Sequence, residues 1–381
     1  MSNEITIKRK CIPIIYTRGT HYEVGFDIGT TFGSMIHDLL EKCVEFLKLP
    51  TYETESGKEA YENTLAVVKE NFPQYIEEIQ GIADGAKVPF YKLFLLHMDD
   101  IMPSSEQNKN CSCENQLSGC STICVNTENV QILAHNEDVL SEMLDLFYLV
   151  SVHIVAEEPR GRWGVKEEKF TSLSYAGHLP GYTMGYNHHG LIFTINTLAA
   201  DKCLVGKTPR YFITRALLAA ENFEQAEQII QDLGCGAGNG CSINMTFLKP
   251  ELPRIFYNIE MGPAYDSQES QLNVITGNCG ETLAHFNMYL RLPVQEIDTG
   301  RIIDTSICRM AVYKNRKEPK SLQDVLEFLG ETNKDNEVYQ NCEVRTVATG
   351  IFDCIANTWT LYADNPKTSE PLVVLPLILK S

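Results

Sequence analysis

The sequence has no uninterrupted apolar run near the roughly 18 residues that a membrane-spanning helix needs, which excludes such a helix. Its first ten residues, MSNEITIKRK, carry charges where a secretory signal peptide needs an apolar stretch. Its 13 cysteines include no CxxC pair, and the closest group has no paired histidine after it: Cys111, Cys113, Cys120 and Cys124. We therefore expect a cytoplasmic protein with no membrane partner and no metal site.

Positive charge is also scarce, because 32 basic residues stand against 50 acidic ones and give a formal net charge of −18. Such a surface repels phosphate backbones, which disfavours nucleic acid as a partner, and it concentrates small cations instead. The glycine-rich stretch at 234–238 has no expected strand before it and no lysine after it, unlike a phosphate-binding loop. The sequence therefore predicts no nucleotide and no other cofactor.

The composition is that of a chain folded throughout, with 44% hydrophobic and 22% charged residues. Residues 1 to 103 are mostly helical by pattern, because apolar residues recur at spacings of three and four in 22–47 and 61–83. Residues 104–118 are polar and aperiodic, which predicts a linker or an exposed loop. From Cys120 the pattern changes to strands, so the sequence predicts a layered α+β fold.

Further helices are expected at 209–233, where Pro209 suits the first turn, and at 322–329. Strands are expected where β-rich runs are bounded by turn residues: 120–125, 130–134, 151–155, 170–175, 190–196, 242–248, 254–260 and 346–362.

The Gly119–Cys120 bond directly follows the polar segment and suits an intramolecular cleavage. The Cys120 thiol could attack the Gly119 carbonyl and form a thioester by an N-to-S acyl shift, which water then resolves. Glycine would permit a strained geometry that a Cβ forbids. Cleavage would free the Cys120 α-amine, which titrates at about 8 and can serve as the base for its own thiol. The plainer alternative is a small buried side chain at a strand start.

Several segments resemble the penicillin acyltransferase-like group of N-terminal nucleophile hydrolases: GCST at 119–122, HNED at 135–138, GYNHHG at 185–190, TPRYFITR at 208–215 and GIFD at 350–353. Others are similar to the insect Tan family of N-β-alanyl-dopamine hydrolases: RGTHY at 18–22, TFGSMI at 31–36, FPQY at 72–75, KLFLLH at 92–97 and AGHLPGYT at 176–183. This resemblance runs along nearly the whole chain. It implies a four-layer αββα sandwich and self-cleavage into a helical fragment 1–119 and a catalytic fragment 120–381, which form one folded unit.

The resemblance also implies roles for residues near the cut. Cys120 is the nucleophile, with its freed amine as base. Thr122 lies two residues along the strand on the same face, where its hydroxyl could bind that amine or assist maturation. Asp138 could hold the ammonium form of the amine, although an aspartate at a strand end is also a common turn or cap residue. Asn136 belongs to the same motif and is a candidate substrate-binding residue.

An amide donor for the oxyanion is expected at Asn287, because the family places an asparagine two residues after a histidine, as in His285-Phe-Asn287. Asn278 is a competing alignment that lacks this histidine. Arg345 lies near the position where relatives have a basic residue at the rim of the active site. A second dipeptide, Gly240–Cys241, lacks the polar loop and the acidic motif, so we interpret it as a structural strand start.

By resemblance, the chain is an amidase that hydrolyses N-β-alanyl-dopamine, and the related histamine conjugate carcinine, to β-alanine and the free amine. A β-alanyl amide presents a primary ammonium, and Glu137 and Glu260 are candidates to bind it. The expected partners are this small cationic amide and the chain's own cleaved fragment, and a homo-oligomer of the cleaved heterodimer is left open. Two other functions fit the same sequence, namely acyl transfer to an amine and binding by an uncleaved, non-catalytic protein.

Overall fold

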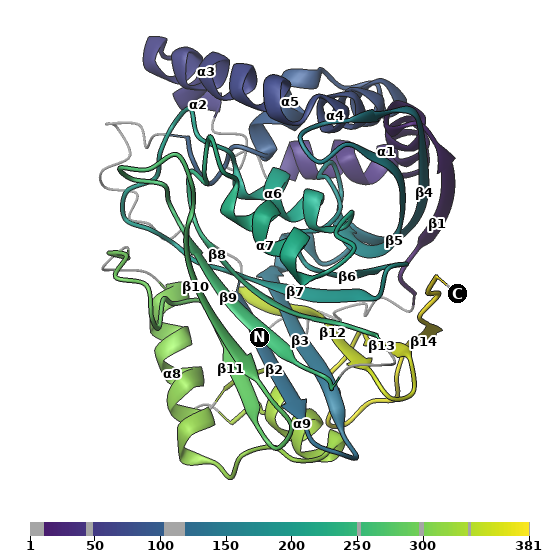
Figure 1. The fold of residues 1–381 in the computed structure, drawn as a ribbon, viewed down its shortest axis with the longest axis vertical. Helices are drawn as coiled ribbons and strands as arrows, with labels where there is room; N and C mark the ends of the chain where they lie inside the picture. The colour runs from purple at the N-terminus through teal and green to yellow at the C-terminus, as the bar shows by residue number, and fades with distance from the viewer. Residues whose placement is uncertain are drawn as a thin grey trace, which may run out of the picture.

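The computed structural model describes residues 11–42, 49–102, 119–249, 253–296, 301–333 and 337–380. Within these ranges, two β-sheets face each other and helices cover their outer sides (Figure 1). The predicted α+β fold with four αββα layers is thereby confirmed. The expected linker at 104–118 lies outside the described residues.

One sheet has the strand order β1-β4-β5-β6-β7-β8-β9-β10, in which only the β1–β4 pair is parallel. Its strands are β1 (Ile14–Gly19), β4 (Phe147–Arg160), β5 (Val165–Tyr175), β6 (Met184–Asn187), β7 (Leu191–Thr197), β8 (Cys241–Phe247), β9 (Phe256–Gly262) and β10 (Gln271–Gly277). The other sheet has the order β11-β2-β3-β12-β13-β14. Its strands are β11 (Thr282–His285), β2 (Gly119–Asn126), β3 (Gln131–Leu140), β12 (Val344–Asp353), β13 (Thr358–Tyr362) and β14 (Val373–Pro376).

The helices of the N-terminal part gather on the side of the eight-stranded sheet, whereas α8 and α9 cover the six-stranded one (Figure 1). Their bounds are α1 (His21–Lys42), α2 (Leu49–Tyr52), α3 (Glu55–Asn71), α4 (Pro73–Ala86), α5 (Phe90–Leu96), α6 (Arg210–Leu217), α7 (Phe223–Gln231), α8 (Arg301–Asn315) and α9 (Leu322–Leu329). In the described part of the chain, no helix combines the length and the apolar character needed to span a bilayer.

Two of the expected helices are wrong as single elements. The pattern at 61–83 belongs to α3 and α4, which are separated at Phe72 because a proline at position 73 disfavours a helical residue before it. The pattern at 209–233 likewise divides into α6 and α7. There Asn222 starts the second helix by accepting a hydrogen bond from the Gln225 N–H, so a cap interrupts an apolar period that runs through it.

The strand expected at 346–362 is also wrong as one element, because it is the hairpin of β12 and β13. Asn357 in its turn has a φ of 52°, a left-handed conformation that asparagine tolerates better than most residues. The hairpin extends the six-stranded sheet beyond β3, and the chain then adds β14 at its edge.

Side chains on β2 and β3 alternate between the two faces of their sheet. Ile123 and Ile132 face outward and pack with Phe328 of α9, whereas Cys124 and Leu133 belong to the core between the sheets. The same alternation directs Cys120 and Glu137 inward, toward β7, and it directs their neighbours toward α8 and α9.

Residues on both sides of the Gly119–Cys120 bond build the same sheet and the same core. Strand β1 precedes the bond and pairs along its whole length with β4, which follows it. A buried ion pair also joins a helix before the bond to a helix after it. The guanidinium of Arg215 in α6 donates to both carboxylate oxygens of Glu78 in α4, at 3.1 and 2.8 Å. The predicted fragments 1–119 and 120–381 are therefore interleaved in space.

Candidate functional site

Cys120 is the second residue of β2 and is only 3% exposed. Asn287 contacts it at both ends: its Oδ1 accepts a hydrogen bond from the Cys120 N–H at 2.8 Å, and its Nδ2 lies 3.4 Å from Sγ. The strand register explains this contact, because His285 at the end of β11 lies opposite Thr122, and two further residues bring the chain alongside Cys120. The His-x-Asn spacing thus has a geometric basis.

Asn278, the competing candidate, lies in an exposed turn. Its backbone N–H and its side-chain amide both donate to Glu281, at 2.6 and 3.2 Å. Of the two asparagines, Asn287 is the one whose side chain reaches the Cys120 sulfur.

Arg309 of α8 is a site residue that sequence reasoning missed. It is 1% exposed, and its Nη1 donates to the Cys120 carbonyl at 2.5 Å and to Ser121 Oγ at 2.9 Å. Its Nη2 donates to Asn287 Oδ1 at 2.9 Å, which fixes the orientation of that amide. The helix that carries it was itself not expected, and a lone arginine on a helix gives no sequence signal of its own.

Asp138 lies directly opposite Gly119 in the β2–β3 pairing. Thr346 donates to its Oδ1 at 2.6 Å, and its Oδ2 is buried without a hydrogen-bond partner in the described part of the chain. Burial raises the pKa of Asp138 to about 6, although Arg309 at 4.0 Å opposes this rise. A buried carboxylate oxygen without a partner therefore lies beside Gly119, the residue that precedes Cys120.

Glu137 lies directly opposite Cys120 in the same pairing and is buried. Its carboxyl group accepts a hydrogen bond from the Tyr175 hydroxyl at 2.9 Å and lies 3.0 Å from His135 Nε2. Burial raises the pKa of Glu137 to about 8 and lowers that of His135 to about 3, so the imidazole is neutral. Glu137 thus has no positively charged partner in this pair.

The sulfur of Cys120, a ring nitrogen of His135 and a carboxylate oxygen of Glu137 lie within 4.8 Å of one another. A thiol, an imidazole and a carboxylate form a donor set that Zn²⁺ accepts, so this is the group in the described residues that could hold a metal ion. All three side chains already have hydrogen-bond partners, and the absence of a metal stays a prediction.

Thr122 shares the inner face of β2 with Cys120, as its spacing predicted. Its hydroxyl lies 2.8 Å from His135 Nδ1 and donates to Asn196 Oδ1 at 2.9 Å. In the described contacts, this hydroxyl reaches the histidine beside Glu137 rather than the nitrogen of Cys120.

The described contacts do not bring the three remaining candidates to Cys120. Asn136 faces α9, where its amide donates to the Leu329 carbonyl at 2.9 Å. Arg345 is partly exposed, and its Nε donates to the Cys342 carbonyl at 3.2 Å.

Glu260, on β9, binds groups of the protein itself. One oxygen lies 3.0 Å from His285 Nε2, and the carboxylate accepts backbone N–H groups from residues 290, 291 and 292 at 2.8 to 3.0 Å. Burial alone would raise the pKa of Glu260, but the hydrogen bonds from His285 and the backbone outweigh it and lower the pKa to about 2. This carboxylate therefore anchors the segment after Asn287.

The two Gly-Cys dipeptides differ in how tightly their glycines are packed. A Cβ on Gly240 would lie 1.8 Å from the Tyr289 Oη and 2.5 Å from the Met261 carbonyl, so packing requires glycine there. A Cβ on Gly119 would lie 3.4 Å from Asp138 Oδ2, which is an ordinary contact. Gly119 also lacks a positive φ, so the strain expected at this position is not seen in the described backbone.

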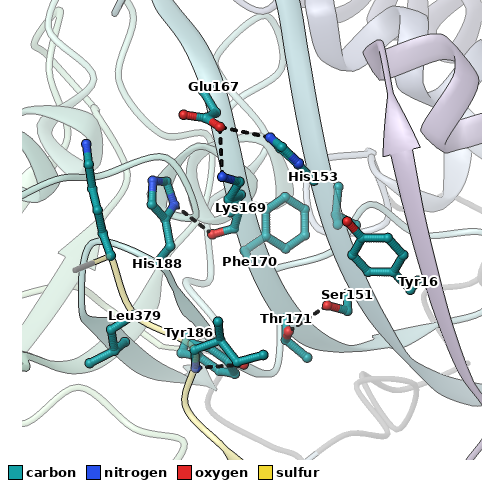
Figure 2. Close-up of a pocket in the computed structure, with 13 residues that line it drawn as sticks. Tyr16, Ser151, His153, Glu167, Lys169, Phe170, Thr171, Tyr186, His188 and Leu379 are labelled. Carbon is teal, nitrogen blue, oxygen red and sulfur yellow. Dashed lines mark hydrogen bonds and ion pairs between the residues drawn. The ribbon is translucent and has the colours of Figure 1, made fainter.

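A pocket of about 510 Å³ lies elsewhere, between strands β1, β4, β5 and β6 and the C-terminal segment (Figure 2). Three of its side chains pair with one another, because His153 and Lys169 both contact Glu167, at 2.8 and 2.9 Å. None of the predicted site residues lines it, so it is separate from the cluster around Cys120.

Comparison with known proteins gives three results. Residues 125–368 match the family described as acyl-coenzyme A:6-aminopenicillanic acid acyl-transferase. The chain is 47% identical over 391 aligned residues to the β-alanyl-dopamine/carcinine hydrolase of Drosophila melanogaster, with full coverage of both chains. Among solved structures, a mutant of the conjugated bile acid hydrolase from Clostridium perfringens is 12% identical, covers 66% of this chain and 95% of its own, and has a TM-score of 0.35. Penicillin V acylase from Agrobacterium tumefaciens is 12% identical, covers 64% and 82%, and has a TM-score of 0.36.

Proposed function

Because the chain belongs to the acyl-coenzyme A:6-aminopenicillanic acid acyl-transferase family, we propose that it is a self-cleaving cysteine amidase whose nucleophile is Cys120. The observation that carries this assignment is the contact of one asparagine with both the nitrogen and the sulfur of a strand-start cysteine. Asn287 Nδ2 is a donor placed beside the sulfur, where the oxyanion of an attacked carbonyl forms.

The proposed substrate is β-alanyl-dopamine, with carcinine as a second substrate. The support is the 47% identity to a hydrolase that bears both substrates in its name. Such amides consist of a short acyl chain with a primary ammonium and an aromatic amine as leaving group. The products are β-alanine and the free amine, dopamine or histamine.

Maturation precedes catalysis in this proposal. The Cys120 sulfur attacks the Gly119 carbonyl carbon, the C–N bond breaks, and the nitrogen takes the thiol proton to become a free amine. Water then hydrolyses the Gly119 thioester and restores the thiol. Asp138 Oδ2 supports this step, because a buried acceptor beside Gly119 can stabilise the ammonium form of the new amine.

Catalysis then repeats the same chemistry on the substrate amide. The α-amine takes the Cys120 proton, the thiolate adds to the carbonyl, and the leaving amine departs with that proton. Water hydrolyses the resulting acyl-thioester and releases β-alanine. A base beside the sulfur is needed, since burial and the nearby Glu137 hold the pKa of the Cys120 thiol above its ordinary value.

Peptide mass spectrometry of the purified protein tests this proposal, because the mature chain should begin at Cys120. A denaturing gel should show fragments of about 13 and 29 kDa from the 42.9 kDa chain. A Cys120→Ala chain should stay whole and inactive, whereas Cys241→Ala should still be cut. A single band at full length, together with no release of β-alanine, would favour the uncleaved binding protein instead.

Acyl transfer is the second candidate, because the family takes its name from an acyl-transferase. The same residues would catalyse acyl transfer, with an amine replacing water in the second half-reaction. Adding a competing primary amine to the assay separates the two. Hydrolysis predicts constant release of β-alanine, whereas transfer predicts a new amide at its expense. A cytoplasmic location is part of the proposal and is tested by cell fractionation.

A further inference from the structure

We propose that Glu137 is the residue that selects the acyl group, by binding the primary ammonium of the substrate beside the Cys120 sulfur. This inference rests on the proposed amidase function and adds the residue that sets its acyl specificity. It concerns the short acyl chain of the proposed substrates, which ends in a cation.

The placement of Glu137 comes from the strand register. It is the cross-strand neighbour of Cys120, so both side chains leave the same face of adjacent strands. A carboxylate oxygen of Glu137 lies within 4.8 Å of Sγ. Any acyl group that is attacked by this sulfur therefore lies next to this carboxylate.

The described contacts give Glu137 no lysine or arginine that would favour its ionised form. Glu137 is 4% exposed, and its neighbours are the Tyr175 hydroxyl and the His135 imidazole. In the described part of the chain, no lysine or arginine pairs with it. A buried carboxylate is costly unless it is paired or protonated, so a bound ammonium would supply the partner that the protein does not.

The chain length of the acyl group fits this distance. In a 3-aminopropanoyl group the nitrogen is three bonds from the carbonyl carbon, so both ends can reach their partners when the sulfur and the carboxylate are neighbours. An ammonium–carboxylate hydrogen bond needs about 2.7–2.9 Å between nitrogen and oxygen. A long acyl chain would carry its cation past Glu137.

The other carboxylates near the site either lie on the other face of the sheet or are already engaged. Asp138 is turned to the other face of the sheet, beside Gly119 and Arg309. Glu260 binds His285 and three backbone N–H groups. Glu137 is thus the carboxylate that faces the sulfur and lacks a charged partner.

The test compares two dopamine amides that differ only at the end of the acyl chain. One carries 3-aminopropanoyl and the other butanoyl, in which a methyl group replaces the ammonium. With EDTA present, the wild-type enzyme should favour the first in kcat/KM by on the order of 10²-fold, and Glu137→Gln should bring this ratio near one. If Glu137 had a purely catalytic or structural role, Glu137→Gln would lower kcat/KM for both amides by the same factor and leave their ratio unchanged.

A matched control is Glu167→Gln. That carboxylate also contacts a histidine and a second donor, but it lines the pocket of Figure 2. It should leave the ratio as in the wild type. Self-cleavage of each variant is checked on a gel before the kinetics.

A second variant covers the case in which Glu137→Gln does not mature. Glu137→Asp keeps the charge but withdraws it by one methylene, so the relative rate should shift from 3-aminopropanoyl toward 4-aminobutanoyl amides. Equal use of the aminoacyl and butanoyl amides by the wild type would overturn the assignment to Glu137. A wild-type protein that hydrolyses neither amide would instead contradict the proposed amidase function.

Discussion

Asn287 holds Cys120 by its nitrogen and its sulfur at once, at 2.8 and 3.4 Å, although 167 positions separate the two residues. Its amide oxygen also accepts a hydrogen bond from Arg309, and its amide nitrogen donates to the Thr197 carbonyl at 3.0 Å while it faces the sulfur. In the proposed mechanism, this single side chain would orient the Gly119–Cys120 bond before the cut and would offer a donor to the oxyanion after it.

Replacing Asn287 should consequently impair the chemistry more than the fold. We expect Asn287→Ala to lower kcat by about 10²–10³-fold, as loss of one oxyanion donor does elsewhere. Steady-state hydrolysis of β-alanyl-dopamine by the matured fraction measures this. Asn278→Ala, in the exposed turn, should behave like the wild type, and an equal loss in both variants would contradict the assignment.

Arg309 and Arg345 make a second matched pair. Arg309→Gln leaves Asp138 without its buried cation and frees the Asn287 amide, so we expect about 3 kcal/mol lower stability and slow or absent self-cleavage. Arg345→Gln should change stability by about 0.5 kcal/mol or less, because its side chain is partly exposed. Urea unfolding of both variants in the uncleaved Cys120→Ala background measures the two losses of stability. A larger loss for Arg345→Gln than for Arg309→Gln would contradict the importance assigned to Arg309.

The two glycines before cysteine should respond differently to alanine. Gly119→Ala meets ordinary contacts, so the chain should fold normally and show its effect in the rate of cleavage. Gly240→Ala forces a methyl group onto the Tyr289 hydroxyl and the Met261 carbonyl, and we expect it to cost about 3 kcal/mol or to prevent folding. Thermal melts and a time course of cleavage after expression distinguish the two effects.

The buried carboxyls predict how stability depends on pH. Burial raises the pKa of Glu137 to about 8 and that of Asp138 to about 6, whereas an unfolded chain titrates both at about 4. Between these values the folded state binds more protons, so their contribution to stability is complete below pH 4 and is lost as the pH rises to 8.

Glu137→Gln cannot ionise, so its free energy of unfolding should fall less steeply between pH 5 and 8. The difference in slope should approach 1.4 kcal/mol per pH unit for one proton. Urea titrations of wild type and variant, both carrying Cys120→Ala, provide the measurement. Parallel slopes would mean that Glu137 is ionised throughout this range.

The sequence predicted the layered α+β fold because apolar periods leave local signals that locate helices and strands. The cut at Gly119–Cys120 and the role of Cys120 as nucleophile stay predictions, which rest on the polar segment before this dipeptide and on the resemblance. The splits at Phe72 and Asn222 were missed, since a proline and a cap end a helix without ending its apolar period. Asn287 was found through a spacing that the β11–β2 register explains.

Arg309 and the inward direction of Glu137 could not be found in the same way. A buried arginine on a helix has no sequence signature of its own, and its partners lie 22 and 189 positions away. The placement of Glu137 and Asp138 on opposite faces follows from alternation along β3, but which face meets the sulfur depends on the pairing with β2.

The pairing of β1 with β4, and of Glu78 with Arg215, has a consequence for the lifetime of the enzyme. The chain folds as one molecule, so assembly of its sheet is a first-order process that does not depend on concentration. If the bond before Cys120 is cut as proposed, the two fragments of an unfolded molecule must find each other in solution, and refolding becomes a second-order process. At a low concentration of the protein, the half-life of the cleaved enzyme would then be set by its unfolding rate rather than by its free energy of unfolding.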